Sequence, residues 1–199
     1  MESFDATAEL ARVIGSSSLV VAGPGRSAWC ATDHWEARAL VIDCLGDVLP
    51  TAVGLSVGIG PRADAQVLSL EGDGSFLFGM QGLSTLAACH VHMSNFIAVI
   101  LDNGILESGG GLPSRSGPIR WNDLCSAFDL PYAEASKLAE IEGAVKAVGR
   151  IGVLRLEVKD REPMLPPRYD LTGQENATRF RRLTSSLLGR DLPPPALKW

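Results

Sequence analysis

Two side chains that carry hard oxygen ligands follow two apolar segments of this chain. Asp73 lies in the tripeptide Gly72-Asp73-Gly74 directly after residues 67–70, and Asn103 follows residues 96–101. If both segments are parallel strands, their carboxyl ends meet at one edge of a sheet, where open α/β sheets bind their ligands. Glycines let backbone N–H groups approach a phosphate, and carboxylate and amide oxygens beside a phosphate suit Mg²⁺. The pattern therefore predicts a magnesium diphosphate site.

Each half of this pattern also has a purely structural interpretation, because the tripeptide could be only a turn and Asn103 only a strand-end cap. An earlier segment offers a rival function. Residues 23–28 fit G-x-G-x-x-A between an apolar segment and an expected helix, and Asp43 follows Gly23 by 20 positions. This is the dinucleotide fingerprint, so a NAD-binding oxidoreductase domain is an alternative. A nicotinamide cofactor, however, gives no reason for the two later oxygen ligands.

The order and spacing of the two later motifs resemble those of a known family. Gly72-Asp73-Gly74, with Asn103 lying 30 positions after Asp73, is similar to the signature of thiamine-diphosphate-dependent enzymes. Residues 101–113, LDNGILESGGGLP, resemble the phosphonopyruvate and sulfopyruvate decarboxylase branch, although Leu112 replaces the glutamine usual in that loop. Residues 20–188 are similar to the diphosphate-binding domain of that branch.

The resemblance implies a role for particular residues. Asp73, Asn103 and the backbone carbonyl of Ile105 would hold Mg²⁺, and Leu45 would support a bent thiamine diphosphate. The bend brings two parts of the cofactor together, so that proximity replaces an external base. The further residues expected at the cofactor are Gly25, Arg26, Ser27, Gly72, Gly74 and Ser75. Glu107 and Ser108, just after the metal-binding segment, are expected to face the reacting carbon.

The same resemblance implies a partner chain. Enzymes of this family need a glutamate from a pyrimidine-binding domain, and 199 residues are too few to hold both domains. We therefore expect one subunit of a split enzyme, like the β subunit of sulfopyruvate decarboxylase, in a hetero-oligomer of α2β2 composition or larger. The expected reaction is decarboxylation of a small 2-oxo acid, with a carboligase of the acyloin or acetolactate type as the alternative.

Composition excludes several other classes of protein. The net charge of −5 provides no basic face for nucleic acid. The four cysteines are far apart and form no CxxC pair, so neither a zinc site nor a disulfide framework is expected. The acidic N-terminus lacks the apolar segment of a signal peptide, and no apolar run is long enough to span a membrane. We expect a cytoplasmic protein.

Hydrophobic periodicity alternates between strands and helices, which predicts an α/β fold with three αβα layers and a mostly parallel sheet. One domain should cover residues 1–188, followed by a loose tail over 189–199. The expected strands are 18–22, 39–42, 67–70, 96–101 and 151–158. The expected helices are 6–14, 27–37, 47–60, 76–89, 121–128, 135–148 and 172–188. Glycine-rich residues 103–119 should form a loop long enough to suggest a function.

Overall fold

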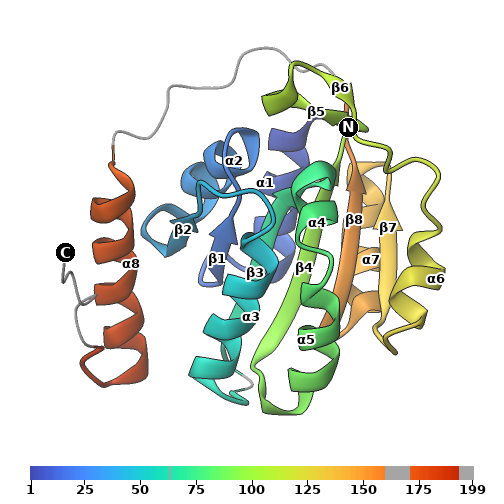
Figure 1. Cartoon of the computed structure of the whole chain (residues 1–199). Coiled ribbons are helices and arrows are strands. Elements are labelled where there is room, and N and C mark those ends of the chain that lie inside the picture. Colours follow the sequence, from blue (N-terminus) through green and yellow to red (C-terminus); the bar gives the residue numbers. More distant parts are fainter. Residues whose placement is uncertain (63, 160–170, 193–199) are drawn as a thin grey trace.

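The computed structural model describes residues 1–62, 64–159 and 171–192, and its centre is a six-stranded sheet (Figure 1). The strand order is β2-β1-β3-β4-β8-β7, and every neighbouring pair is parallel. A separate antiparallel hairpin is formed by β5 and β6. The strands are β1 (Leu19–Ala22), β2 (Ala39–Val41), β3 (Gln66–Gly72), β4 (Asn95–Asp102), β5 (Ile105–Leu106), β6 (Leu112–Pro113), β7 (Tyr132–Ala135) and β8 (Ile151–Glu157).

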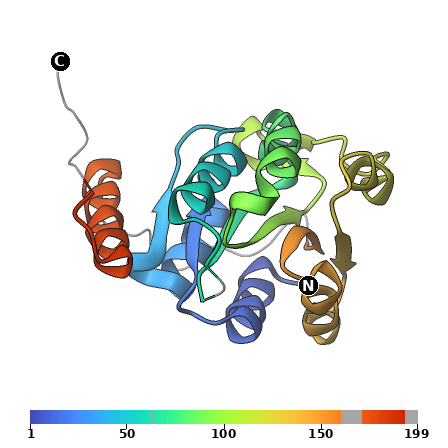
Figure 2. The same cartoon turned by 90° about the horizontal axis from the view of Figure 1, so that it is seen from below.

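Helices cover both faces of the sheet and give the expected three layers (Figure 2). One face packs against α1, α2 and α7 through an apolar core that includes Leu10 and Ile141. The other packs against α3, α4, α5 and α6 through a core that includes Phe76 and Phe96. The helices are α1 (Ser3–Ile14), α2 (Arg26–Trp35), α3 (Val48–Ile59), α4 (Asp73–Phe78), α5 (Gly82–Cys89), α6 (Trp121–Ser126), α7 (Ile141–Val148) and α8 (Gly173–Leu188).

The predicted fold class is confirmed, and the order of the strands locates the ligand-binding edge. β1 pairs with β2 on one side and with β3 on the other, so the chain changes direction across the sheet between β1 and β3. In open parallel sheets such a switch point leaves a crevice at the carboxyl ends of the strands. The segments after β1 and β3 begin at Gly23 and Asp73, which are both motif residues. Among the described residues, no helix combines the length and apolar character that a bilayer crossing requires.

Three elements differ from their prediction. The single helix expected over 76–89 is two helices, α4 and α5, separated by a turn at Gly79, whose backbone packs against that of Gly46. The helix expected over 135–148 begins only at Ile141, after a 3-10 turn, and is preceded by the unpredicted edge strand β7. That strand reads Tyr-Ala-Glu-Ala, lies at the edge of the sheet, and has only Ala135 fully buried, so its sequence shows no clear apolar alternation. The expected loop over 103–119 contains the β5–β6 hairpin.

Helix α8 protects the opposite edge of the sheet, strand β2. The buried Asn176 side chain accepts a hydrogen bond from the Val41 N–H and donates one to the Ala39 carbonyl, each with a donor–acceptor distance of 2.9 Å. The carboxamide thus satisfies the same backbone groups that a further strand would pair with. An edge closed in this way cannot recruit a strand from another molecule. Thr172 starts the helix as a capping box with Glu175.

Replacing Asn176 with alanine should destabilise the fold and expose this edge. The buried Val41 N–H and Ala39 carbonyl would both lose their partner, which should cost about 3 kcal/mol. Urea denaturation measures the loss, and light scattering at increasing concentration measures association. The matched control is Gln174→Ala, on an exposed position of the same helix. A variant at Asn176 with wild-type stability would show that the edge does not depend on this side chain.

Candidate functional site

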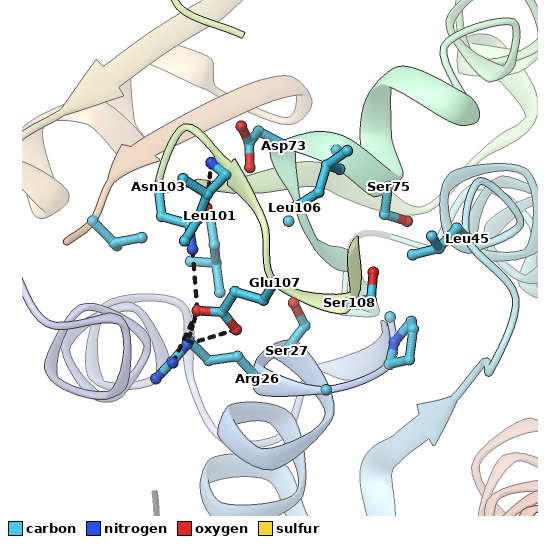
Figure 3. A pocket seen from close by; sticks show the side chains of 17 residues that line it. Arg26, Ser27, Leu45, Asp73, Ser75, Leu101, Asn103, Leu106, Glu107 and Ser108 are labelled. Atoms are coloured by element: carbon cyan, nitrogen blue, oxygen red, sulfur yellow. Dashed lines mark hydrogen bonds and ion pairs between the residues drawn. The ribbon is translucent and has the colours of Figure 1, made fainter. Parts of the chain in front are cut away.

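A pocket lies at the carboxyl ends of the central strands, at the switch point between β1 and β3. Its cavity of about 130 Å³ is smaller than the roughly 300 Å³ at which ligand pockets begin. Every residue that we predicted at a cofactor or catalytic site lines this one pocket (Figure 3), although they come from four separate segments. These residues are Gly25, Arg26, Ser27, Leu45, Gly72, Asp73, Gly74, Ser75, Asn103, Ile105, Glu107 and Ser108.

Asp73 is the first residue of α4, and its side chain is almost fully buried. Oδ2 accepts a hydrogen bond from the Ser114 hydroxyl, whereas the buried Oδ1 has no hydrogen-bond partner among the described residues. Burial raises the pKa of Asp73 above its ordinary value, and the negative charge of Asp102 adds to that rise. An unpartnered carboxylate oxygen in an apolar setting is costly, and a bound cation would remove the cost. This oxygen therefore fits a metal ligand.

Asn103 follows β4 on the same side of the pocket as Asp73 (Figure 3). Its Oδ1 accepts the Ile105 N–H at 3.1 Å, and its Nδ2 donates to Glu107 Oε1 at 3.3 Å. A carbonyl oxygen has two lone pairs, so one hydrogen bond leaves capacity for an ion. One carboxylate, one carboxamide and nearby backbone carbonyls form a hard-oxygen donor set, which suits Mg²⁺ with phosphate and water as its remaining ligands.

Arg26 and Glu107 form an ion pair across the pocket. Arg26 Nε and Nη2 each lie 2.9 Å from Glu107 Oε1, and the arginine side chain is only 16% exposed. Glu107 therefore faces Arg26 and Asn103. Arg26 and Ser27 occupy the first two positions of α2, after Gly25, whose φ of +70° favours glycine. The start of this helix directs backbone N–H groups and positive potential toward the pocket, as an anionic ligand requires.

The β5–β6 hairpin covers the Gly72-Asp73-Gly74 turn. A side chain at Gly74 would overlap the end of Leu106, so the missing side chain allows the hairpin to pack directly on the turn. Leu45 lies on the other side of the pocket and is 39% exposed. Leu45 is therefore not a core leucine, and its side chain is accessible from the pocket. Ser108 also lines the pocket, on an exposed turn.

Several residues at the site were not predicted. Ser114 reaches Asp73 from 41 positions away, and no local pattern in the sequence indicates this contact. Ser116 donates to Asp102 at 2.8 Å, and Arg155 Nε donates to the same carboxylate at 2.6 Å. Glu71 is fully buried beside the tripeptide. An acidic residue ending an otherwise apolar strand was a signal that could have identified it.

A family assignment follows from comparison with known proteins. Residues 26–155, more than half of the chain, match the family "Thiamine pyrophosphate enzyme, C-terminal TPP binding domain". The chain belongs to this family, which favours the thiamine-diphosphate interpretation over the nicotinamide one.

Two individual proteins are similar to the chain. The β subunit of sulfopyruvate decarboxylase from Methanocaldococcus jannaschii is 25% identical over 137 residues, which are 67% of this chain and 69% of the relative. The X-ray structure of a protein described as a candidate thiamin diphosphate-dependent enzyme, from Mycobacterium smegmatis, superimposes with a TM-score of 0.64 at 22% identity. That alignment covers 80% of this chain but 32% of the larger protein, so it shows the shared fold alone.

Proposed function

We propose that this chain is the diphosphate-binding subunit of a split thiamine-diphosphate-dependent decarboxylase that acts on a small 2-oxo acid. The observation that carries the proposal is the meeting of Asp73 and Asn103, from the ends of β3 and β4, in one pocket where Asp73 keeps a buried, unpartnered oxygen. Membership of the thiamine pyrophosphate enzyme family supports thiamine diphosphate as the cofactor. The decarboxylase reaction and the split arrangement are supported by the similarity to a subunit of sulfopyruvate decarboxylase.

Each residue of the pocket has a separate role in this proposal. Asp73 and Asn103, with the Ile105 carbonyl, would hold Mg²⁺, and the N-terminal turn of α2 would face the diphosphate. Leu45 would support the cofactor from its apolar side. The hairpin that bears Leu106 would exclude water above the Gly72-Asp73-Gly74 turn, which strengthens every charge interaction inside the pocket. Ser75 would contribute its backbone N–H, because its hydroxyl proton is donated to Glu71.

Thiamine diphosphate, when bound, supplies a carbon nucleophile for the keto group and accepts the electron pair released with carbon dioxide. This chain must therefore keep the cofactor oriented and the pocket dry. The pocket is too small for the whole cofactor, and a partner subunit with the pyrimidine-binding domain would complete it. We propose a hetero-oligomer, α2β2 or larger, in the cytoplasm.

The test is to purify the chain together with a pyrimidine-domain chain and to measure carbon dioxide release. Sulfopyruvate, phosphonopyruvate and pyruvate are the substrates, with thiamine diphosphate and with either Mg²⁺ or EDTA. We expect release only from the two chains together and only with Mg²⁺. Product analysis by mass spectrometry separates an aldehyde from a carbon–carbon ligation product, and native mass spectrometry gives the stoichiometry. Turnover by the chain alone would contradict the split arrangement, and the absence of cofactor binding by the complex would contradict the whole proposal.

A further inference from the structure

Glu71 is a fully buried carboxylic acid for which the proposed function gives no role. It lies in β3, two residues before Asp73, and its Cβ faces Gly23 on the neighbouring segment after β1. Its Oε1 makes no hydrogen bond of normal geometry within the described parts of the chain, and the Leu49 backbone N–H at the start of α3 is the backbone donor that acts on the carboxyl group. A buried polar atom without a partner costs free energy, and an apolar residue would complete this strand at lower cost. The carboxyl group therefore needs an explanation.

The other carboxyl oxygen begins a short chain of hydrogen bonds that ends at the loop containing Leu45. The Ser75 hydroxyl donates to Glu71 Oε2 at 2.5 Å, and its oxygen accepts the Gly46 N–H at 3.2 Å. A hydroxyl has a single proton, so donating it to Glu71 turns the oxygen lone pairs toward Gly46. Without an acceptor at position 71, the hydroxyl could rotate and give its proton elsewhere.

Gly46 is also held by packing, which makes its position sensitive to small shifts. Its φ of +87° favours glycine, and a side chain on Gly79 would overlap the Gly46 carbonyl oxygen. The two backbones are therefore in direct contact where α4 ends. Leu45 precedes Gly46 and extends its side chain into the pocket, near Ser75 (Figure 3). A fixed Gly46 amide thus fixes the backbone from which Leu45 projects.

We propose that Glu71 is a positioning residue: through Ser75 it holds the Gly46 amide and so sets the place of Leu45 in the pocket. The inference rests on the proposed function, in which Leu45 supports the cofactor. Glu71 does not line the pocket, so its effect on the reaction is indirect. Loss of the hydrogen bonds from Glu71 through Ser75 to Gly46 should shift Leu45 but leave Asp73 in place. Turnover should therefore fall, whereas the affinity for the cofactor should not change.

The first experiment tests the link without any enzymatic assay. Amide hydrogen exchange of Gly46 is measured by NMR in the chain alone, for wild type, Ser75→Ala, Glu71→Ala and Glu71→Gln. We expect exchange to accelerate about tenfold or more in both alanine variants, because the amide loses a closed hydrogen bond. The glutamine side chain keeps an acceptor for Ser75 and should retain protection. Ser84→Ala, which removes a hydroxyl-to-carbonyl hydrogen bond to Gln81 at an exposed position of α5, is the matched control.

Unchanged Gly46 exchange in both alanine variants would overturn the inference. Ser75→Ala serves as the milder probe if Glu71→Ala fails to fold, since it changes one hydroxyl and keeps the backbone. Thermal unfolding of each variant separates a local opening from global destabilisation.

The second experiment uses the two-chain complex at saturating cofactor. Glu71→Ala and Ser75→Ala should lower kcat about tenfold, with the Kd for thiamine diphosphate within about twofold of wild type, and Glu71→Gln should restore kcat. A parallel loss of affinity and kcat would indicate a merely structural role and overturn the inference. An inactive wild-type complex would contradict the proposed function, and the Gly46 exchange data would still decide on the link to Glu71.

Discussion

The Asp73→Ala variant should lose Mg²⁺-dependent binding of thiamine diphosphate, and with it at least about 99% of the activity of the two-chain complex. Asp73 is the only carboxylate in the expected ligand set, so the alanine variant lacks the negative charge that attracts Mg²⁺. A hundredfold loss corresponds to about 2.7 kcal/mol of transition-state stabilisation. Isothermal titration with cofactor, with and without Mg²⁺, measures the binding change, and carbon dioxide release measures the activity.

This variant should fold normally, because the metal-free carboxyl group is buried with one oxygen unpartnered and its pKa is raised. The matched control is Asp123→Ala, which breaks an exposed ion pair with Arg120 on α6 and should change neither binding nor activity. Asp73→Asn keeps the shape without the charge and should bind more weakly than wild type. Mg²⁺-dependent turnover by Asp73→Ala at the wild-type rate would refute the metal assignment.

The second large effect concerns stability and pH in the chelator-treated chain. Burial raises the pKa of Glu71 to about 7 from an ordinary 4.5, against the lowering effects of the hydrogen bonds from the Ser75 hydroxyl and the Leu49 backbone N–H. The folded state therefore holds this proton at pH values where the unfolded chain has released it. The stabilising contribution is full below pH 4.5 and disappears as pH rises toward 7, a total of about 3 kcal/mol.

Glu71→Gln removes this titration, so the variant should gain about 3 kcal/mol relative to wild type between pH 4.5 and 8. Urea denaturation at several pH values gives the difference between the two curves. Glu142→Gln is the control, since the hydrogen bond from Lys146 lowers the pKa of that exposed carboxylate below this range. Its curve should run parallel to wild type. Parallel curves for Glu71→Gln would show that the buried acid does not titrate in this range.

The fold was predictable where the apolar pattern is strong. The strands that form the centre of the sheet, β3, β4 and β8, are long and largely buried, and each contains an apolar segment that predicted it. The edge strand β7 was missed because only one of its four residues, Ala135, is fully buried, so it contains no apolar segment that would indicate a strand. The break between α4 and α5 was missed as well, because it depends on the contact of Gly79 with Gly46, 33 positions earlier.

The candidate site was predictable to the extent that motif order encodes strand order. Asp73 and Asn103 end neighbouring parallel strands, and the residues predicted around them line one pocket. The interactions among them could not be predicted. The ion pair of Arg26 with Glu107 joins residues 81 positions apart, and Ser114 reaches Asp73 over 41. Such contacts depend on how the β5–β6 hairpin folds back over the sheet, and neither composition nor hydrophobic periodicity predicts the position of that hairpin.

The pairing of Asn176 with β2 also has a consequence for synthesis on the ribosome. Strand β2 leaves the exit tunnel more than 130 residues before Asn176, which supplies the groups that close its edge. The nascent chain can assemble the parallel sheet in that interval, but its first edge stays bare until α8 emerges. Helix α8 is therefore the last element to cover the sheet. Binding of chaperones to the exposed β2 edge during translation should be greatest just before α8 emerges.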